Sequence, residues 1–139
     1  MSRYKRRVII KFIIKKTKHK LPHIMADNAH ADIYLSDLSA YNDAVAATAN
    51  GGKPLVINFT ATWCPPCKRI GPIYEGLIAA HPELVMKKLD VDANAEGSQA
   101  AGINCMPTFK VYKNGVLSET MEGASEEGLS TLLNKAKTA

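Results

Sequence analysis

The chain has 139 residues, of which 46% are hydrophobic, and a formal net charge of +5. This length suits one domain with a core that is stable without disulfide staples, and three cysteines are too few for a disulfide scaffold. Residues 1–24 hold nine Lys or Arg and no acid, whereas residues 25–139 hold nine basic and thirteen acidic side chains. The body is therefore acidic, which argues against a basic surface for nucleic acid.

Residues 1–24 are interpreted as a basic N-terminal extension ahead of a domain at 25–139. The segment is compatible with a disordered extension, with an acid-free organelle-targeting peptide, and with weak contact to a membrane surface. A secretory signal is disfavoured because Lys11 splits the apolar run "VIIKFII" and no small-residue cleavage site follows. The segment is also too short to span a bilayer.

From residue 32 onward the pattern alternates between strand and helix. We predict strands at 32–35, 54–61, 84–92, 108–112 and 116–121, and helices at 36–50, 64–80, 94–101 and 125–138. Ser36 is the expected cap of the first helix, and Pro72 is expected to kink the second. Leu129, Leu132 and Leu133 should face the core. The order implies an α/β fold with a mixed central sheet and helices on both faces.

Cys64 and Cys67, in "TATWCPPCKRIGP", follow the buried strand at 54–61 and open a helix. A metal site would need four ligands, and the remaining candidates are Cys105 and four scattered histidines. A structural disulfide across two residues would constrain the unfolded chain very little. A redox couple fits better, because a helix start favours a thiolate at Cys64 and Cys67 lies one turn on. Pro65 and Pro66 suit the first helical turn, where a missing N–H breaks no intrahelical bond.

Four stretches in order and register, "FTATWCPPCKRIGP", "KKLDVDAN", "GINCMPTF" and "YKNG", resemble the thioredoxin family. The resemblance covers about residues 32–135. It implies a thioredoxin fold, in which four helices flank a mixed sheet of five strands, the last two antiparallel to the others. The pair is "WCPPC" here, whereas most members of the family have "WCGPC".

The resemblance also implies roles for single residues. Cys64 would be the exposed nucleophile and Cys67 the buried resolving thiol. Pro107 matches the family's cis-proline, so the Met106 backbone would pair with an extended substrate segment. The expected apolar contact patch consists of Trp63, Pro65, Ile103 and Met106. Gly123 matches a glycine that lets backbones approach there, the alternative being an ordinary turn before the last helix.

Asn58 departs from the family, because it occupies the position of a buried aspartate that accepts the proton of the resolving thiol. An amide cannot act as a general base, so we expect slower resolution of the mixed disulfide. The alternative is an Asn that simply forms hydrogen bonds in the core. Lys88 matches the lysine paired with that aspartate and is expected to lack its carboxylate here. Water, or Lys88 itself if burial made it neutral, would then accept the proton.

Cys105 lies beside the expected cis-proline. It is a candidate regulatory thiol if exposed, and a small core residue if buried.

The sequence thus predicts a thiol–disulfide oxidoreductase that reduces protein disulfides through a mixed disulfide, in service of electron transport and cell redox homeostasis. The alternatives are a dedicated redox partner and a non-catalytic binding or chaperone module. No bound cofactor and no metal are expected, and electrons would come from NADPH through thioredoxin reductase. Disulfide-containing proteins would be the targets. We expect a cytoplasmic monomer, or a mitochondrial or other organelle protein if residues 1–24 are a targeting segment.

Overall fold

The computed structural model describes residues 31–138. The sheet and its helices belong to the unit Ile33–Ala139. The predictions made for residues 1–24 lie outside the described residues. None of the helices between residues 31 and 138 is long and apolar enough to cross a membrane.

The predicted order of strands and helices after residue 36 is confirmed, with ends that shift by a few residues. The strands are β1 (Leu55–Thr60), β2 (Val85–Asp90), β3 (Thr108–Lys113) and β4 (Val116–Glu122). The helices are the short 3-10 turn η1 (Ala31–Ile33), α2 (Leu38–Ala46), α3 (Pro65–Leu77), α4 (Ala95–Ala100) and α5 (Glu126–Lys137).

The sheet has four strands in the order β2-β1-β3-β4, with β1 and β2 parallel and the other pairs antiparallel. β3 alone runs against the others, because β4 is antiparallel to β3 and therefore parallel to β1. The expectation that both of the last two strands would be antiparallel to the rest was wrong. β4 forms an edge of the sheet, and its residues Glu119 and Glu122 face Val111 and Thr108 across the ladder.

The expected fifth strand at 32–35 is reduced to a single parallel bridge between Tyr34 and Lys88, backed by a 2.8 Å bond from Leu35 N–H to the Lys88 carbonyl. Residues 31–33 form η1 instead, and the Asp37 carboxylate already caps α2 by accepting from Ala40 N–H. Only three residues, 34–36, lie between these features and are left to pair with β2. The cap is thus Asp37 and not Ser36 as predicted.

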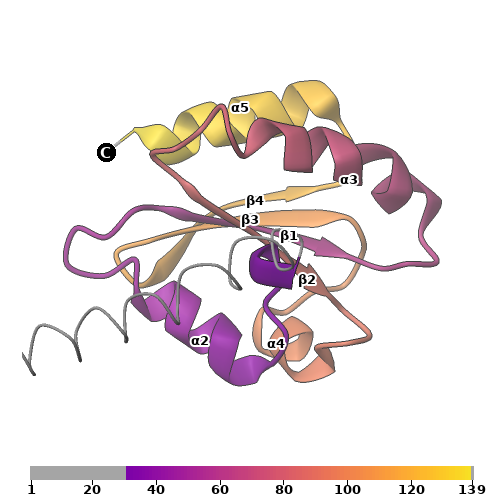
Figure 1. The fold of residues 1–139 in the computed structure, drawn as a ribbon, viewed down its shortest axis with the longest axis horizontal. Helices are drawn as coiled ribbons and strands as arrows, with labels where there is room; N and C mark the ends of the chain where they lie inside the picture. Colours follow the sequence, from indigo (N-terminus) through magenta and orange to yellow (C-terminus); the bar gives the residue numbers. More distant parts are fainter. Residues whose placement is uncertain (1–30, 139) are drawn as a thin grey trace, which may run out of the picture. The chain divides into compact units, whose positions relative to one another are not determined.

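Helices cover both faces of the sheet, α3 and α5 on one side and α2 and α4 on the other (Figure 1). Side chains alternate along β1, so that Val56 packs in the core under α3 and α5 while Leu55, Ile57 and Phe59 pack in the core on the α2 side. The expected inward residues of α5 are fully or almost fully buried: Leu129, Leu132 and Leu133. β1 is thus buried on both faces, as its apolar sequence predicted.

β1 ends at Thr60, and only four residues separate it from the start of α3. This short connection fixes the first turn of α3 at the carboxyl end of a central strand. Such a position is where α/β sheets commonly place their chemistry. Pro72 lies inside α3, and the helix continues beyond it to Leu77.

Candidate active site

A disulfide joins Cys64 and Cys67 at the start of α3, with their Cα atoms 5.3 Å apart. Cys64 is the N-cap residue of the helix, and its sulfur accepts the N–H of Cys67 at 3.4 Å. The Cys67 N–H and the helix dipole therefore face this sulfur and favour a thiolate there once the disulfide is reduced. This is the placement that the sequence predicted.

The prolines between the cysteines occupy the first two positions of α3 and are exposed. Their missing N–H groups remove no intrahelical bond at these positions. The predicted place of Pro65 and Pro66 is confirmed.

Cys64 is 4% exposed and Cys67 3% exposed, so the expectation of an exposed Cys64 was wrong. Both sulfur-bearing residues cluster with Ala61, and Met106 packs against them. The capping position turns the Cys64 side chain back over the helix start and away from open solvent. Only a small part of this residue is open to a target.

Met106 and Pro107 are joined by a cis peptide bond, as expected from the resemblance. The Met106 carbonyl oxygen lies 3.7 Å from the Cys64 sulfur. Gly123 donates its N–H to the Pro107 carbonyl at 2.9 Å, which ties the loop before α5 to this segment. Gly123 has φ 95°, and a Cβ added there would meet nothing within 4 Å. The positive φ favours glycine at this position, and the part of Gly123 in the approach of a target backbone stays a prediction.

Trp63 is 62% exposed, and its indole N–H donates to Asp92 at 2.7 Å. Asp92 follows β2 and was not singled out from the sequence. The sequence could have pointed to Asp92, because it lies two residues after the end of β2, which is parallel to β1. Parallel strands end at the same edge of a sheet, so an acid after β2 is expected near the residues that follow β1.

The contact patch predicted around the sulfur is partly assembled. Trp63 and Pro65 are exposed beside the pair, and Met106 packs against it. Ile103 instead packs against the core on the α2 side. Its part in target binding stays a prediction.

Asn58 is fully buried in β1, and neither its amide nitrogen nor its oxygen has a hydrogen-bond partner among the described residues. The alternative of an Asn satisfied by hydrogen bonds in the core is therefore wrong. Its position under α3 is the one expected for the family's acid, next to Lys88 on β2 in the parallel register.

Lys88 is 6% exposed and donates to the Glu75 carboxylate at 2.7 Å. The expectation that Lys88 lacks a carboxylate was wrong, because the partner comes from α3 and not from β1. Burial lowers the pKa of Lys88, but the hydrogen bond and charge of Glu75 together with the interaction with Tyr34 outweigh it, and the net pKa is raised. Lys88 is therefore a cation, and a neutral lysine base is excluded. Glu75 lies eight residues after Cys67, on nearly the same face of α3, and this spacing could have pointed to it.

Cys105 carries a free thiol that is half-buried beside Met106. Its sulfur lies 3.6 Å from the Thr108 hydroxyl, which donates to the Cys105 carbonyl at 2.7 Å. The regulatory role of Cys105 stays a prediction.

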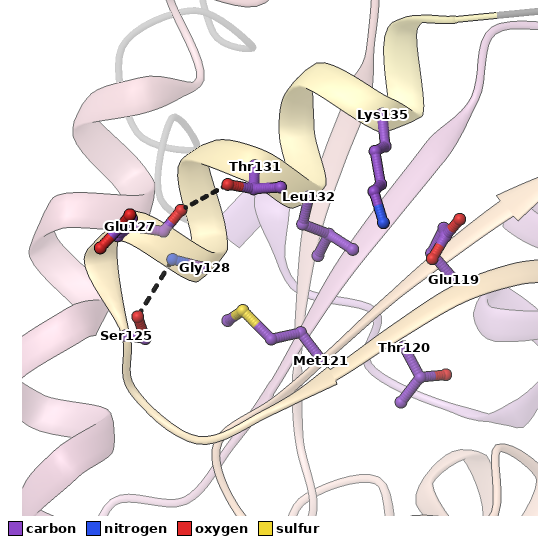
Figure 2. A pocket seen from close by; sticks show the side chains of 9 residues that line it. All are labelled: Glu119, Thr120, Met121, Ser125, Glu127, Gly128, Thr131, Leu132 and Lys135. Carbon is purple, nitrogen blue, oxygen red and sulfur yellow. Dashed lines mark hydrogen bonds between the residues drawn. The ribbon is translucent and has the colours of Figure 1, made fainter.

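A hollow of about 370 Å³ lies between β4 and α5, where Met121 sits beneath the turn that carries Gly128 (Figure 2). None of the residues that line it belongs to the cysteine pair or its surroundings. In residues 31–138 no three His, Cys, Asp or Glu side chains are grouped so as to hold a metal ion.

Comparison with known proteins agrees with this geometry. A family model described as Thioredoxin matches residues 33–135. An H-type thioredoxin of Chlamydomonas reinhardtii is 42% identical over 104 residues, which cover 74% of this chain and 92% of that protein. A thioredoxin of Ictalurus punctatus is 42% identical over 108 residues, covering 76% of this chain and 98% of the relative.

Solved structures show the same fold. The X-ray structure of Fasciola hepatica thioredoxin superposes with a TM-score of 0.70 at 31% identity, covering 75% of this chain and 98% of the other. Plasmodium falciparum thioredoxin gives a TM-score of 0.68 at 34% identity, with 73% and 96% covered. The fold, the cysteine pair at the head of α3 and these matches lead to one conclusion: the chain belongs to the thioredoxin family and is a thiol–disulfide oxidoreductase.

Proposed function

We propose that the protein works as a general reductant of protein disulfides, with Cys64 as nucleophile and Cys67 as resolving thiol. The observation that carries this assignment is the bond from Cys67 N–H to the Cys64 sulfur at the N-terminus of α3. A thiolate gains from that donor and from the helix dipole at Cys64, whereas Cys67 lies inside the first turn.

The reaction runs in two exchanges. The Cys64 thiolate attacks one sulfur of a target disulfide, which forms a mixed disulfide and releases the other target sulfur as a thiolate. The Cys67 thiolate then attacks the Cys64 sulfur, forming the Cys64–Cys67 bond and releasing the second target sulfur. Two electrons pass to the target, and the protein ends in the oxidised state.

Target binding is proposed to use the backbone at Met106 and the surfaces of Trp63 and Pro65, with Ile103 and Gly123 at the rim. Support comes from the Met106 carbonyl, which lies 3.7 Å from the Cys64 sulfur. An extended target segment that pairs with this backbone would bring its disulfide to the nucleophile.

Electrons would reach the pair from NADPH through a thioredoxin reductase, the partner that the family implies. We place the protein in the cytoplasm as a monomer, since a reducing dithiol works where thiols are kept reduced. Organelle targeting or membrane contact through residues 1–24 is the alternative. Cell fractionation and binding to anionic vesicles, each with and without residues 1–24, would separate these.

The reduction potential of the Cys64–Cys67 couple tests the direction of the reaction. Equilibration with glutathione or dithiothreitol buffers should give a value near that of thioredoxins, about −270 mV. A potential well above about −200 mV would indicate an oxidant or isomerase and would overturn the reductase assignment.

Cys64→Ser separates catalysis from binding. It should abolish NADPH-dependent reduction of insulin disulfides in the presence of thioredoxin reductase. Insulin reduction that survives the substitution would favour chemistry outside the pair. A binding or chaperone role would survive Cys64→Ser. If the protein were a dedicated redox partner, even the wild type would not reduce insulin.

A further inference from the structure

A second, smaller hollow of about 170 Å³ lies beside the resolving thiol. Its lining brings Cys67 together with Thr60, Lys88 and Asp90, and Asp90 supplies the one carboxylate among the residues that line it. Water takes up about 30 Å³ per molecule, so the hollow has room for several waters. It therefore joins a thiol that must lose a proton to a group that can accept one.

Cys67 needs such a group because the thiolate, and not the thiol, attacks the mixed disulfide. A thiol with an ordinary pKa of about 8.5 is mostly protonated at neutral pH. Asn58 offers an amide, which cannot accept the proton, and Lys88 is already a cation. Glu75 is hydrogen-bonded to Lys88 and does not line the hollow.

Asp90 is well placed to serve. Its Oδ1 accepts the N–H groups of Asp92 at 2.9 Å and of Ala93 at 3.1 Å, so that the turn after β2 holds the carboxylate in position. Both bonds use the same oxygen, which leaves Oδ2 as the oxygen to take up a proton. Lys88 lies two residues earlier on the same side of β2 and lines the same hollow.

We propose that the Asp90 carboxylate accepts the Cys67 proton through water in this hollow. As the proton leaves, the Cys67 sulfur forms the bond to Cys64, and the bond from Cys64 to the target sulfur breaks. The target sulfur departs with the electron pair and is protonated by solvent. Asp90 then returns its proton to solvent, so the exchange consumes no further reactant.

The test separates the two exchanges with dithionitrobenzoate, an aromatic disulfide whose released thiolate is coloured. A Cys105→Ser background leaves only the pair to react. At equal concentrations, the first release of colour reports the attack by Cys64 and the second reports the attack by Cys67. Asp90→Asn keeps an oxygen for the Asp92 and Ala93 N–H groups and removes only the proton acceptor.

We expect Asp90→Asn to slow the second release roughly 10- to 100-fold and to leave the first unchanged. Added formate, a small base that fits the hollow, should restore the second release. Asn58→Asp combined with Asp90→Asn should restore it as well, because a carboxylate returns to the same face of the sheet. Asp43→Asn, which removes an exposed carboxylate on α2, should change neither phase.

A second release within about twofold of wild type in Asp90→Asn would overturn the proposal. Slowing that neither formate nor Asn58→Asp relieves would mean that Asp90 only holds the turn, and it would overturn the proposal too. Slowing in Glu75→Gln but not in Asp90→Asn would do the same, since the acceptor would then be Glu75. If Asp90→Asn does not fold, Asp90→Ser takes its place. Formate should then accelerate the second release in Asp90→Ser, and no acceleration would overturn the proposal.

Discussion

Asn58 and Lys88 are register partners on the parallel strands β1 and β2, yet the lysine forms its ion pair with Glu75 on helix α3. The strand position that carries an acid elsewhere in the family is a buried amide without a hydrogen-bond partner among the described residues. The charge of Lys88 is thus still neutralised, but by a carboxylate on helix α3 and not by one on the sheet.

The Asn58 amide should contribute little to stability. The Asn58 amide makes no hydrogen bond, so its removal breaks none. We therefore expect Asn58→Ala to lower the free energy of unfolding by no more than about 1 kcal/mol. Asn94 is the matched control, because it is also buried but donates to the Leu35 carbonyl and accepts from Gly97 N–H. Asn94→Ala should cost about 1 to 3 kcal/mol in urea unfolding. Equal costs for the two would contradict the structure at Asn58.

The Lys88–Glu75 pair should make stability fall at alkaline pH. The pKa of Lys88 is raised on folding, so its contribution is complete below the ordinary pKa of 10.5 and is lost as the pH rises above it. Lys88→Met should cost about 1 kcal/mol at neutral pH, and the difference from wild type should shrink above about pH 11. Urea midpoints measured across this range would check it.

Lys137→Met is the control for that experiment, because Lys137 pairs with the exposed Glu83 at 2.9 Å. Exposed pairs add little, so its midpoint should stay at that of wild type. A pH-independent cost of Lys88→Met would show that lost packing, and not charge, is responsible.

Two glycines should respond oppositely to alanine. Gly76 lies exposed in α3, and a Cβ there would meet nothing within 4 Å. Gly76→Ala should therefore raise the free energy of unfolding by up to about 1 kcal/mol through helix propensity. At Gly52 a Cβ would overlap the Ala47 carbonyl oxygen, so Gly52→Ala should cost about 1 to 3 kcal/mol. Thermal unfolding of both variants is sufficient, and a gain at Gly52 would contradict the described path of the chain after α2.

Arg69 should position the loop that borders the target site. Its guanidinium donates to the Ala124 carbonyl at 2.8 Å, and the neighbouring Gly123 donates to Pro107. Arg69→Met should raise KM for a protein target by roughly 3- to 10-fold with kcat little changed, the result expected when binding alone is weakened. Reaction of Cys64 with a small disulfide should be unaffected. Lys53→Met, which breaks a bond to the Pro82 carbonyl on another loop, should leave KM unchanged. A lowered kcat would instead place Arg69 in the chemistry.

The cysteine pair, its prolines and the strand before it were predictable because each follows from local rules of helix starts and buried strands. The cis bond at Pro107 followed from the family resemblance. Glu75, Asp92 and Arg69 were missed because their partners lie 13, 29 and 55 residues away in the chain, and only the packing of layers brings them together. The prediction of a fifth strand was wrong for a local reason, because Asp37 caps α2 only two residues after Leu35. The burial of Cys64 depends on contacts with Met106, which no spacing within the motif reveals.

Within residues 31–138 the outer edge of β4 pairs with no other strand, and this edge could take part in self-association. Val116 and Leu117 are exposed at the start of this strand, and Glu119 and Glu122 follow along it. An apolar strand with an unpaired edge invites another copy to add its own strand, whereas two like charges repel such a copy. Replacing both glutamates by glutamine would remove the repulsion and leave the backbone edge unchanged. That double variant should thus aggregate edge to edge, whereas the same strand with lysine at both positions should not.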